Sequence, residues 1–287
     1  MYTKINGFGI DYIAEGSSVN LPVVLIHGFP FSKKMWGPQI EALKKDYYVV
    51  AYDVRGHGLS DVGNGQYTIE YCVDDLVGLL DLLKISKAVV AGLSMGGYIA
   101  LRTAERNPDR LKGLVLCDTR SEADTNEIKI NRTLQAKSVK IFGAKKFANT
   151  FIPTVLYENT IKKKPEIVKL LREIIDRASP IAITGMLIAL AARTDTSSWL
   201  RNIDVPTLLM GGKYDEMTPP TVLSSMKEEI PNAELHIIPD AAHLCNLENP
   251  DEFNKHLLAF LKKIYQIICS DTELALTFIF VDQTGVW

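Results

Sequence analysis

The sequence predicts an α/β fold built on an eight-stranded, mostly parallel sheet, with helices on both faces and a helical segment inserted after the sixth strand. Short apolar runs of strand length alternate with helical patterns along most of the chain, and such alternation is typical of parallel sheets. It stops between residues 119 and 200, where the apolar spacing is helical throughout. We therefore expect the sheet to be formed by two parts of the chain, residues 1–118 and 201–264.

Strands are expected where short apolar runs are bounded by turn-forming residues. They fall near residues 2–6, 8–14, 22–27, 47–53, 87–92, 111–117, 206–211 and 233–238. Helices are expected where apolar residues recur every three or four positions, near residues 36–44, 68–83, 95–106, 219–229 and 249–263. Because helices alternate with strands, they should cover both faces of the sheet.

Length and composition agree with one compact domain of enzyme size. The chain has 287 residues, of which 47% are hydrophobic, enough to bury a large core. Its net charge is −2, its pI is near 6.2, and no Lys/Arg-rich stretch is interleaved with aromatic residues, so nucleic acid is not an expected partner. The first residues lack the apolar stretch of a signal peptide, and no run of about 18 apolar residues could span a bilayer. We expect a soluble, cytoplasmic protein without a membrane partner.

The most informative motif is Gly92-Leu-Ser94-Met-Gly96, which directly follows an apolar strand and opens a helical pattern. Five-residue patterns recur by chance, so a plain glycine-rich turn is the alternative interpretation. In the G-x-S-x-G pattern, however, the serine lies on a tight strand-to-helix turn that exposes its hydroxyl. The N–H of Met95 and the positive end of the helix would then lie beside Ser94, where negative charge develops during acyl transfer.

Two further strands end in residues that could complete a catalytic group. Asp215 follows the strand that ends in Gly211-Gly212, and His243 follows the next strand after a short loop. Open parallel sheets place ligands at the carboxyl ends of their strands. The order Ser94, Asp215, His243 therefore makes Ser94 a candidate nucleophile, His243 its base and Asp215 the acid that orients the base.

Asp118 is an alternative to Asp215, because it also follows a strand. Upstream, His27-Gly28-Phe29-Pro30 follows the third strand, and its loop could aim the N–H of Phe29 at the same oxyanion as Met95.

These motifs, together with Asp53-Val-Arg-Gly-His-Gly-Leu-Ser60, resemble the α/β-hydrolase superfamily between about residues 10 and 264. The resemblance is to a bacterial branch that holds carboxylesterases, 3-oxoadipate enol-lactonases and perhydrolase-like arylesterases. Leu116-Cys-Asp-Thr-Arg-Ser-Glu-Ala-Asp124 looks closest to the small carboxylesterases of that branch. Some α/β hydrolases carry the triad acid after the sixth strand, so Asp118 stays the alternative acid. We prefer Asp215, because its Gly-Gly-x-x-Asp loop and its distance ahead of His243 match the resembled branch.

The resemblance implies a serine carboxylesterase that acts on small carboxylic esters through an acyl-enzyme. It implies the catalytic residues Ser94, Asp215 and His243 and the oxyanion-hole residues Phe29 and Met95, with no metal and no organic cofactor. A small-molecule ester would be the partner, and the chain would be a monomer or homodimer. An enol-lactonase or a perhydrolase is the alternative on the same fold, and a ligand receptor without turnover is the alternative of a different class.

Residues 119–200, which we call the lid, are expected to form helices over Ser94. The lid carries nine Lys and five Arg against three Asp and five Glu, a net formal charge of +6. This charge could attract anionic substrates. Our preferred interpretation is that Lys145-Lys146 and Lys162-Lys163-Lys164 only solvate helix ends.

Residues 265–287 form a C-terminal tail to which we assign no function. Nothing in the resembled branch accounts for it. The segment 274–281 is apolar and strand-prone, so if ordered it should cover a sheet edge or join a partner chain.

Overall fold

The computed structural model describes the backbone of residues 1–283 and the side chains of residues 1–267. It contains one eight-stranded sheet in the order β1-β2-β4-β3-β5-β6-β7-β8. The strands are β1 Tyr2–Ile5, β2 Phe8–Glu15, β3 Pro22–Ile26, β4 Tyr48–Tyr52, β5 Ala88–Leu93, β6 Leu111–Cys117, β7 Thr207–Gly212 and β8 Ala233–Ile238. β2 pairs antiparallel with β1 and β4, and all other neighbouring strands are parallel. The predicted mostly parallel sheet is confirmed.

The central strands form the core because they are apolar on both faces. Every residue of β5 is buried, as are all residues of β3 and β4 except the first of each. A strand covered on both sides cannot alternate apolar with polar side chains, so its sequence is a continuous apolar run. This pattern placed the strands within one or two residues of their observed ends.

Helices flank the sheet, and two 3₁₀ segments connect to it. The helices of the sheet region are α1 Gly37–Leu43, α2 Ile69–Leu82, α3 Met95–Arg106, α8 Pro220–Glu229, α9 Cys245–Glu248 and α10 Pro250–Gln283, with 3₁₀ turns at η1 Lys33–Trp36 and η2 Pro108–Arg110. α3 packs against β3, β5 and β6, whereas α10 packs against β7 and β8. α2 begins where predicted because the side chain of Thr68 accepts the N–H of Tyr71, which satisfies a free donor of the first turn.

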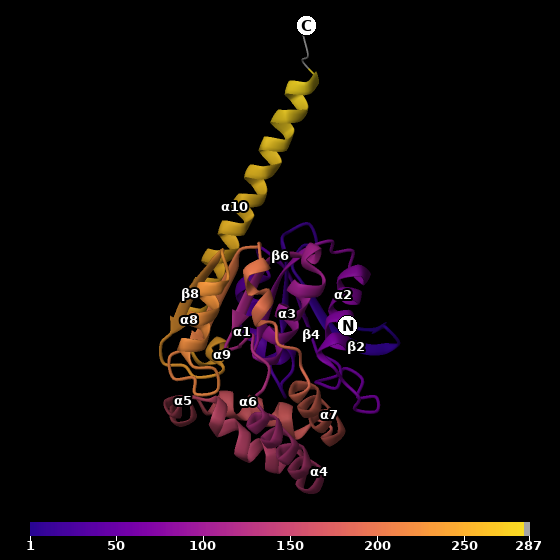
Figure 1. Ribbon diagram of the computed structural model, residues 1–287, viewed down its shortest axis with the longest axis vertical. Coiled ribbons are helices and arrows are strands. Elements are labelled where there is room, and N and C mark those ends of the chain that lie inside the picture. The colour runs from indigo at the N-terminus through magenta and orange to yellow at the C-terminus, as the bar shows by residue number, and fades with distance from the viewer. Residues whose placement is uncertain (284–287) are drawn as a thin grey trace.

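The lid helices gather at one end of the molecule, on the opposite side from the projecting end of α10 (Figure 1). They are α4 Asn126–Val155, α5 Glu158–Lys163, α6 Pro165–Asp176 and α7 Pro180–Ala191, followed by η3 Ser197–Asn202. α4 packs on α6 and α7. It changes direction at Gly143, whose φ of 80° interrupts the helix. The apolar spacing of the sequence is explained by burial of Ile167, Leu171, Ile174, Ile175, Ile183, Met186, Leu187 and Leu190.

The C-terminal tail continues α10 as a helix to Gln283, and Figure 1 shows this helix projecting beyond the sheet. The expectation of an extended segment at residues 274–281 is therefore wrong. An extended segment needs a neighbouring strand to satisfy its backbone groups, whereas a helix satisfies them internally and adds one hydrogen bond for each residue it fixes.

Within the described part of the chain, no single helix has both the length and the hydropathy to cross a membrane. Taken together, α6 and α7 are long and apolar enough to cross a membrane, but the two helices are bent by 98° relative to each other.

Candidate active site

Ser94 lies in a sharp turn between β5 and α3. Its φ of 53° and ψ of −111° are a conformation that non-glycine residues rarely adopt. The turn is possible because Gly92 and Gly96 have no side chain: a Cβ on Gly92 would lie 2.1 Å from the carbonyl oxygen of Gly96, and one on Gly96 would lie 2.2 Å from that of Ile26. The N–H of Ser94 donates to the carbonyl of Cys117 at 2.9 Å. The predicted strand-to-helix turn is thus present and tied to the end of β6.

The two predicted oxyanion-hole residues, Phe29 and Met95, line the same pocket as Ser94. Met95 is the first residue of α3, where helical N–H groups have no intrahelical acceptor and the helix end is positive. Phe29 follows β3, and its neighbour Gly28 lies so close that a Cβ there would be 3.5 Å from the Cβ of Ser94. Phe29 and Met95 both line the same pocket as Ser94 and His243. The structure therefore brings all four residues together.

His243 links the serine to the predicted acid. Its Nε2 lies 2.9 Å from the Oγ of Ser94, and its Nδ1 lies 2.8 Å from Oδ2 of Asp215. Asp215 is held in place by further donors: its Oδ1 accepts the N–H groups of Met217 and Thr218 at 2.8 and 3.0 Å, and its Oδ2 accepts the hydroxyl of Thr218. An Nδ1–H donated to Asp215 leaves Nε2 free to accept a proton from Ser94.

The environment of this group favours the charged form of both partners. Burial of the His243 ring lowers its pKa, but the charge and hydrogen bond of Asp215, with the charges of Asp118 and Glu248, outweigh burial and raise the pKa above its ordinary 6.5. Burial also raises the pKa of Asp215, but His243 and the hydrogen bonds from Thr218 lower it below its ordinary 3.8 overall. Asp215 is therefore ionised at neutral pH and can stabilise an imidazolium.

Asp118, the alternative acid, has different partners. Its Oδ1 accepts the N–H of Gly212 at 2.8 Å, and its Oδ2 accepts that of Cys245 at 3.2 Å. Burial, followed by the charge of Asp215, raises the pKa of Asp118 to about 7. The structure thus brings Asp215, rather than Asp118, to the imidazole.

Glu248 and Thr218 belong to this network but were not identified from the sequence. Glu248 is completely buried, and its Oε1 accepts the N–H groups of Ala242 and Leu244 at 2.8 and 3.4 Å, on both sides of His243. An acid five residues after a candidate histidine, in Leu244-Cys-Asn-Leu-Glu248, was the signal available for Glu248. A threonine three residues after Asp215 carries no comparable signal.

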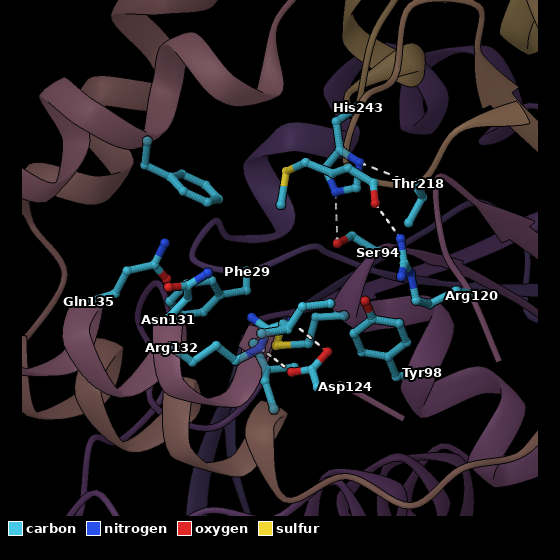
Figure 2. A pocket seen from close by; sticks show the side chains of 15 residues that line it. Phe29, Ser94, Tyr98, Arg120, Asp124, Asn131, Arg132, Gln135, Thr218 and His243 are labelled. Atoms are coloured by element: carbon cyan, nitrogen blue, oxygen red, sulfur yellow. Dashed lines mark hydrogen bonds and ion pairs between the residues drawn. The ribbon is translucent and has the colours of Figure 1, made fainter. Parts of the chain in front are cut away.

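A pocket of about 220 Å³ opens at Ser94. Figure 2 shows Ser94 and His243 on one side, with Asn131, Arg132 and Gln135 of α4 across from them. The wall is therefore mixed, because these polar groups share it with apolar side chains, namely Phe29, Met95, Ile128, Phe151, Leu190 and Met217.

Little of the positive charge of the lid reaches the pocket. None of the nine lid lysines lines it, and of the lid arginines only Arg120 and Arg132 do. Arg132 is paired with the buried carboxylate of Asp124, which also bonds Arg193. Arg120 donates to the carbonyl of Met217 and has no carboxylate partner among the described residues.

Among the described residues, no group of three or more His, Cys, Asp or Glu side chains is arranged to hold a metal ion.

Comparisons with known proteins give the family. Residues 22–250 match the family model for the alpha/beta hydrolase fold. The chain is 31% identical to 3-oxoadipate enol-lactonase 1 of Acinetobacter baylyi over 265 residues, covering 92% of this chain and 97% of that protein. The structure of a thermophilic esterase from Thermogutta terrifontis, with malate bound, superposes with a TM-score of 0.89 at 36% identity, covering 92% of this chain and 99% of that one.

The enol-lactonase from Burkholderia xenovorans superposes with a TM-score of 0.85 at 30% identity, covering 91% of this chain and all of that one. These similarities confirm the bacterial branch predicted from the motifs. By its family model and by the extent of these matches, the chain belongs to the α/β-hydrolase family.

Proposed function

We propose that this protein is a serine carboxylesterase that hydrolyses small carboxylic esters. The observation that carries the proposal is the continuous chain of hydrogen bonds from Ser94 through His243 to Asp215 at the wall of a pocket. A nucleophile bonded to a base, which is oriented by a third group, is the arrangement that nucleophilic catalysis needs. The similarity to a thermophilic esterase gives further support.

In the proposed acylation step, Oγ of Ser94 attacks the ester carbonyl while its proton moves to Nε2 of His243. The N–H groups of Phe29 and Met95 bind the oxyanion of the tetrahedral intermediate. As the bond between carbonyl carbon and alcohol oxygen breaks, His243 gives its proton to the leaving alcohol. Asp215 stabilises the imidazolium between these two transfers.

In the deacylation step, water takes the place of the alcohol. His243 removes a proton from the water as its oxygen attacks the acyl carbon. The bond to Oγ then breaks, the proton returns to Ser94, and the carboxylic acid leaves. The net reaction consumes one ester and one water and releases one acid and one alcohol.

A panel of nitrophenyl esters of increasing acyl length, beside an enol-lactone and a peroxide halogenation assay, tests the proposal. We expect the highest kcat/KM with short acyl esters, because a pocket of about 220 Å³ is smaller than the sites that enclose drug-sized ligands. Halogenation without ester hydrolysis would favour a perhydrolase. Saturable ligand binding without turnover would instead indicate a receptor.

Hydrolysis should decline on the acid side of a pH profile, because His243 must be neutral to accept the proton of Ser94. Asp215, Asp118 and Glu248 together raise the pKa of His243 above 6.5 despite its burial. The midpoint of the acid limb of kcat/KM, which reports the free enzyme, is therefore expected above pH 6.5. Activity that stays constant down to pH 4 in a folded enzyme would exclude a histidine base.

An enol-lactonase is the second candidate, and Arg120 is the observation that favours it. Arg120 lines the pocket beside Ser94 without a carboxylate partner among the described residues. A guanidinium in that position could bind the carboxylate of an anionic lactone with two hydrogen bonds. Similar proteins include enol-lactonases.

Arg120→Met separates the two candidates. For the esterase we expect neutral short esters to remain the better substrates, with kcat/KM within about twofold of wild type and only weakly dependent on salt, because the lid lysines do not line the pocket and exposed charges are screened beyond about 8 Å. The control is Lys145→Met, which removes an exposed lid charge. A preference for a carboxylated lactone that is lost in Arg120→Met but kept in Lys145→Met would replace the esterase with the lactonase.

A further inference from the structure

Glu248 is a buried carboxylate that the proposed reaction does not use. It ends α9, five residues after His243, and is completely buried. Such groups are rare in protein interiors unless they are fully hydrogen-bonded. Glu248 meets this condition mainly through backbone N–H groups, so its place is fixed by the loops around it rather than by an ion pair.

The bonds of Glu248 join two parts of the site. Oε1 accepts the N–H groups of Ala242 and Leu244, and the backbone on both sides of His243 is thereby attached to one oxygen atom. Oε2 accepts the N–H of Tyr157 at 2.7 Å, in the lid turn just before α5. One carboxylate therefore bridges the histidine loop and the lid.

The same lid turn also contacts the loop that carries the acid. The ring of Tyr157 stacks on that of Tyr214 with 4.2 Å between ring centres and 3° between planes, and Tyr214 directly precedes Asp215. Thr160 of α5 adds a side-chain hydrogen bond to Glu248. Both loops that position His243 are thus in contact with one segment of the lid.

We propose that Glu248 is a positioning residue for His243: its carboxylate holds the backbone on both sides of the imidazole and ties that loop to the lid at Tyr157. The seating of the lid then helps to set the distance between Nε2 of His243 and Oγ of Ser94. This inference rests on the proposed hydrolytic function. It adds a residue that touches neither substrate nor reacting atoms.

The charge of Glu248 acts on the pKa of His243, and this pKa can be measured. The measurement distinguishes a positioning role of Glu248 from a purely stabilising one. Three carboxylates on elements packed around His243 act on the charge of its imidazole: Asp215 after β7, which bonds the ring, Asp118 after β6 and Glu248 on α9. Each of them raises the pKa of His243. Replacing Glu248 with a neutral side chain of equal size should therefore lower that pKa and move the acid limb of activity to lower pH.

Glu248→Gln is the test. Its oxygen can still accept from the histidine loop, but its NH₂ group would face the N–H of Tyr157, where an acceptor is needed. We expect kcat, normalised to active sites titrated with a fluorophosphonate, to fall about ten- to a hundredfold, as for small misplacements of reacting groups. KM should change little, because Glu248 does not line the pocket, and the acid limb should move to lower pH.

Two further variants make the outcome decisive. Glu248→Asp keeps the charge but is too short to reach both loops, so kcat should fall while the acid limb stays near that of wild type. Glu248→Asp also tests the proposal if Glu248→Gln does not fold. Asp75→Asn is the control: Asp75 is a buried carboxylate that pairs with Arg55, and its loss should lower the melting temperature without moving the acid limb.

Wild-type kcat per active site and an unmoved acid limb in folded Glu248→Gln would overturn the inference, as would wild-type kcat in folded Glu248→Asp. Such results would leave the esterase proposal intact. An inactive wild-type enzyme would instead refute the esterase proposal itself.

Discussion

Replacement of Ser94 by alanine is expected to lower the turnover of ester substrates by a factor on the order of 10⁶. The loss should be this large because His243 has no other nucleophile to activate in the proposed reaction. The hydroxyl is also the only group removed. The pocket, the oxyanion-hole backbone and the pair of His243 with Asp215 would all remain.

The fold should survive this change. Alanine at position 94 must adopt the same φ of 53° as serine, so the backbone strain is similar in both proteins, and the N–H bond to Cys117 is retained. Turnover of a nitrophenyl ester and the melting temperature would be measured together. Ser225→Ala, on the exposed side of α8, is the matched control and should behave as wild type. Near-normal activity in Ser94→Ala would remove Ser94 from the mechanism.

The sheet could be predicted closely because burial on both faces leaves a direct record in the sequence. β5 is apolar from Ala88 to Leu93 and ends at a glycine-flanked serine, so both the strand and the turn after it were evident. The positions of Asp215 and His243 could be predicted for a related reason, because each residue follows a strand of the same parallel sheet. Residues at the ends of neighbouring parallel strands meet at one edge, whatever their distance along the chain.

The lid was predictable only as a set of helices. Which of its side chains face Ser94 depends on the break in α4 at Gly143 and on the packing of α4 against α7, neither of which is local. Apolar spacing indicates which face of each lid helix is buried. It does not indicate how the lid helices as a group are turned relative to the pocket. For that reason, the sequence could not predict that the polar side chains of Asn131 and Gln135 line the pocket.

The acid was harder to assign than the nucleophile because two aspartates follow neighbouring strands, β6 and β7. The position after a strand is the same for both, so the preference for Asp215 depended on its resemblance to a family motif and not on geometry. The structure distinguishes them: both oxygens of Asp118 accept backbone N–H groups, those of Gly212 and Cys245, whereas Oδ2 of Asp215 lies 2.8 Å from Nδ1 of His243. Glu248 was missed because its partners come from segments far apart in the chain, the lid turn at Tyr157 and the histidine loop at Ala242.

Asp215→Asn is therefore expected to lower kcat by a factor on the order of 10⁴. An amide in this position no longer stabilises the imidazolium, and its NH₂ group can present a donor to Nδ1, which would favour the tautomer with the proton on Nε2. That tautomer cannot accept a proton from Ser94. The measurement is kcat for a nitrophenyl ester at a pH where His243 of the wild type is neutral.

Asp118→Asn is the matched comparison and should cost far less. Burial and the charge of Asp215 raise the pKa of Asp118 to about 7, so the neutral carboxyl is already well populated near neutral pH and the variant changes the local charge only in part. An asparagine oxygen can still accept the N–H of Gly212, although its NH₂ group faces the N–H of Cys245 and would weaken that contact. If Asp118→Asn lost more activity than Asp215→Asn in folded protein, the role of the acid would pass to Asp118, and the hydrogen bond between His243 and Asp215 would have to be structural.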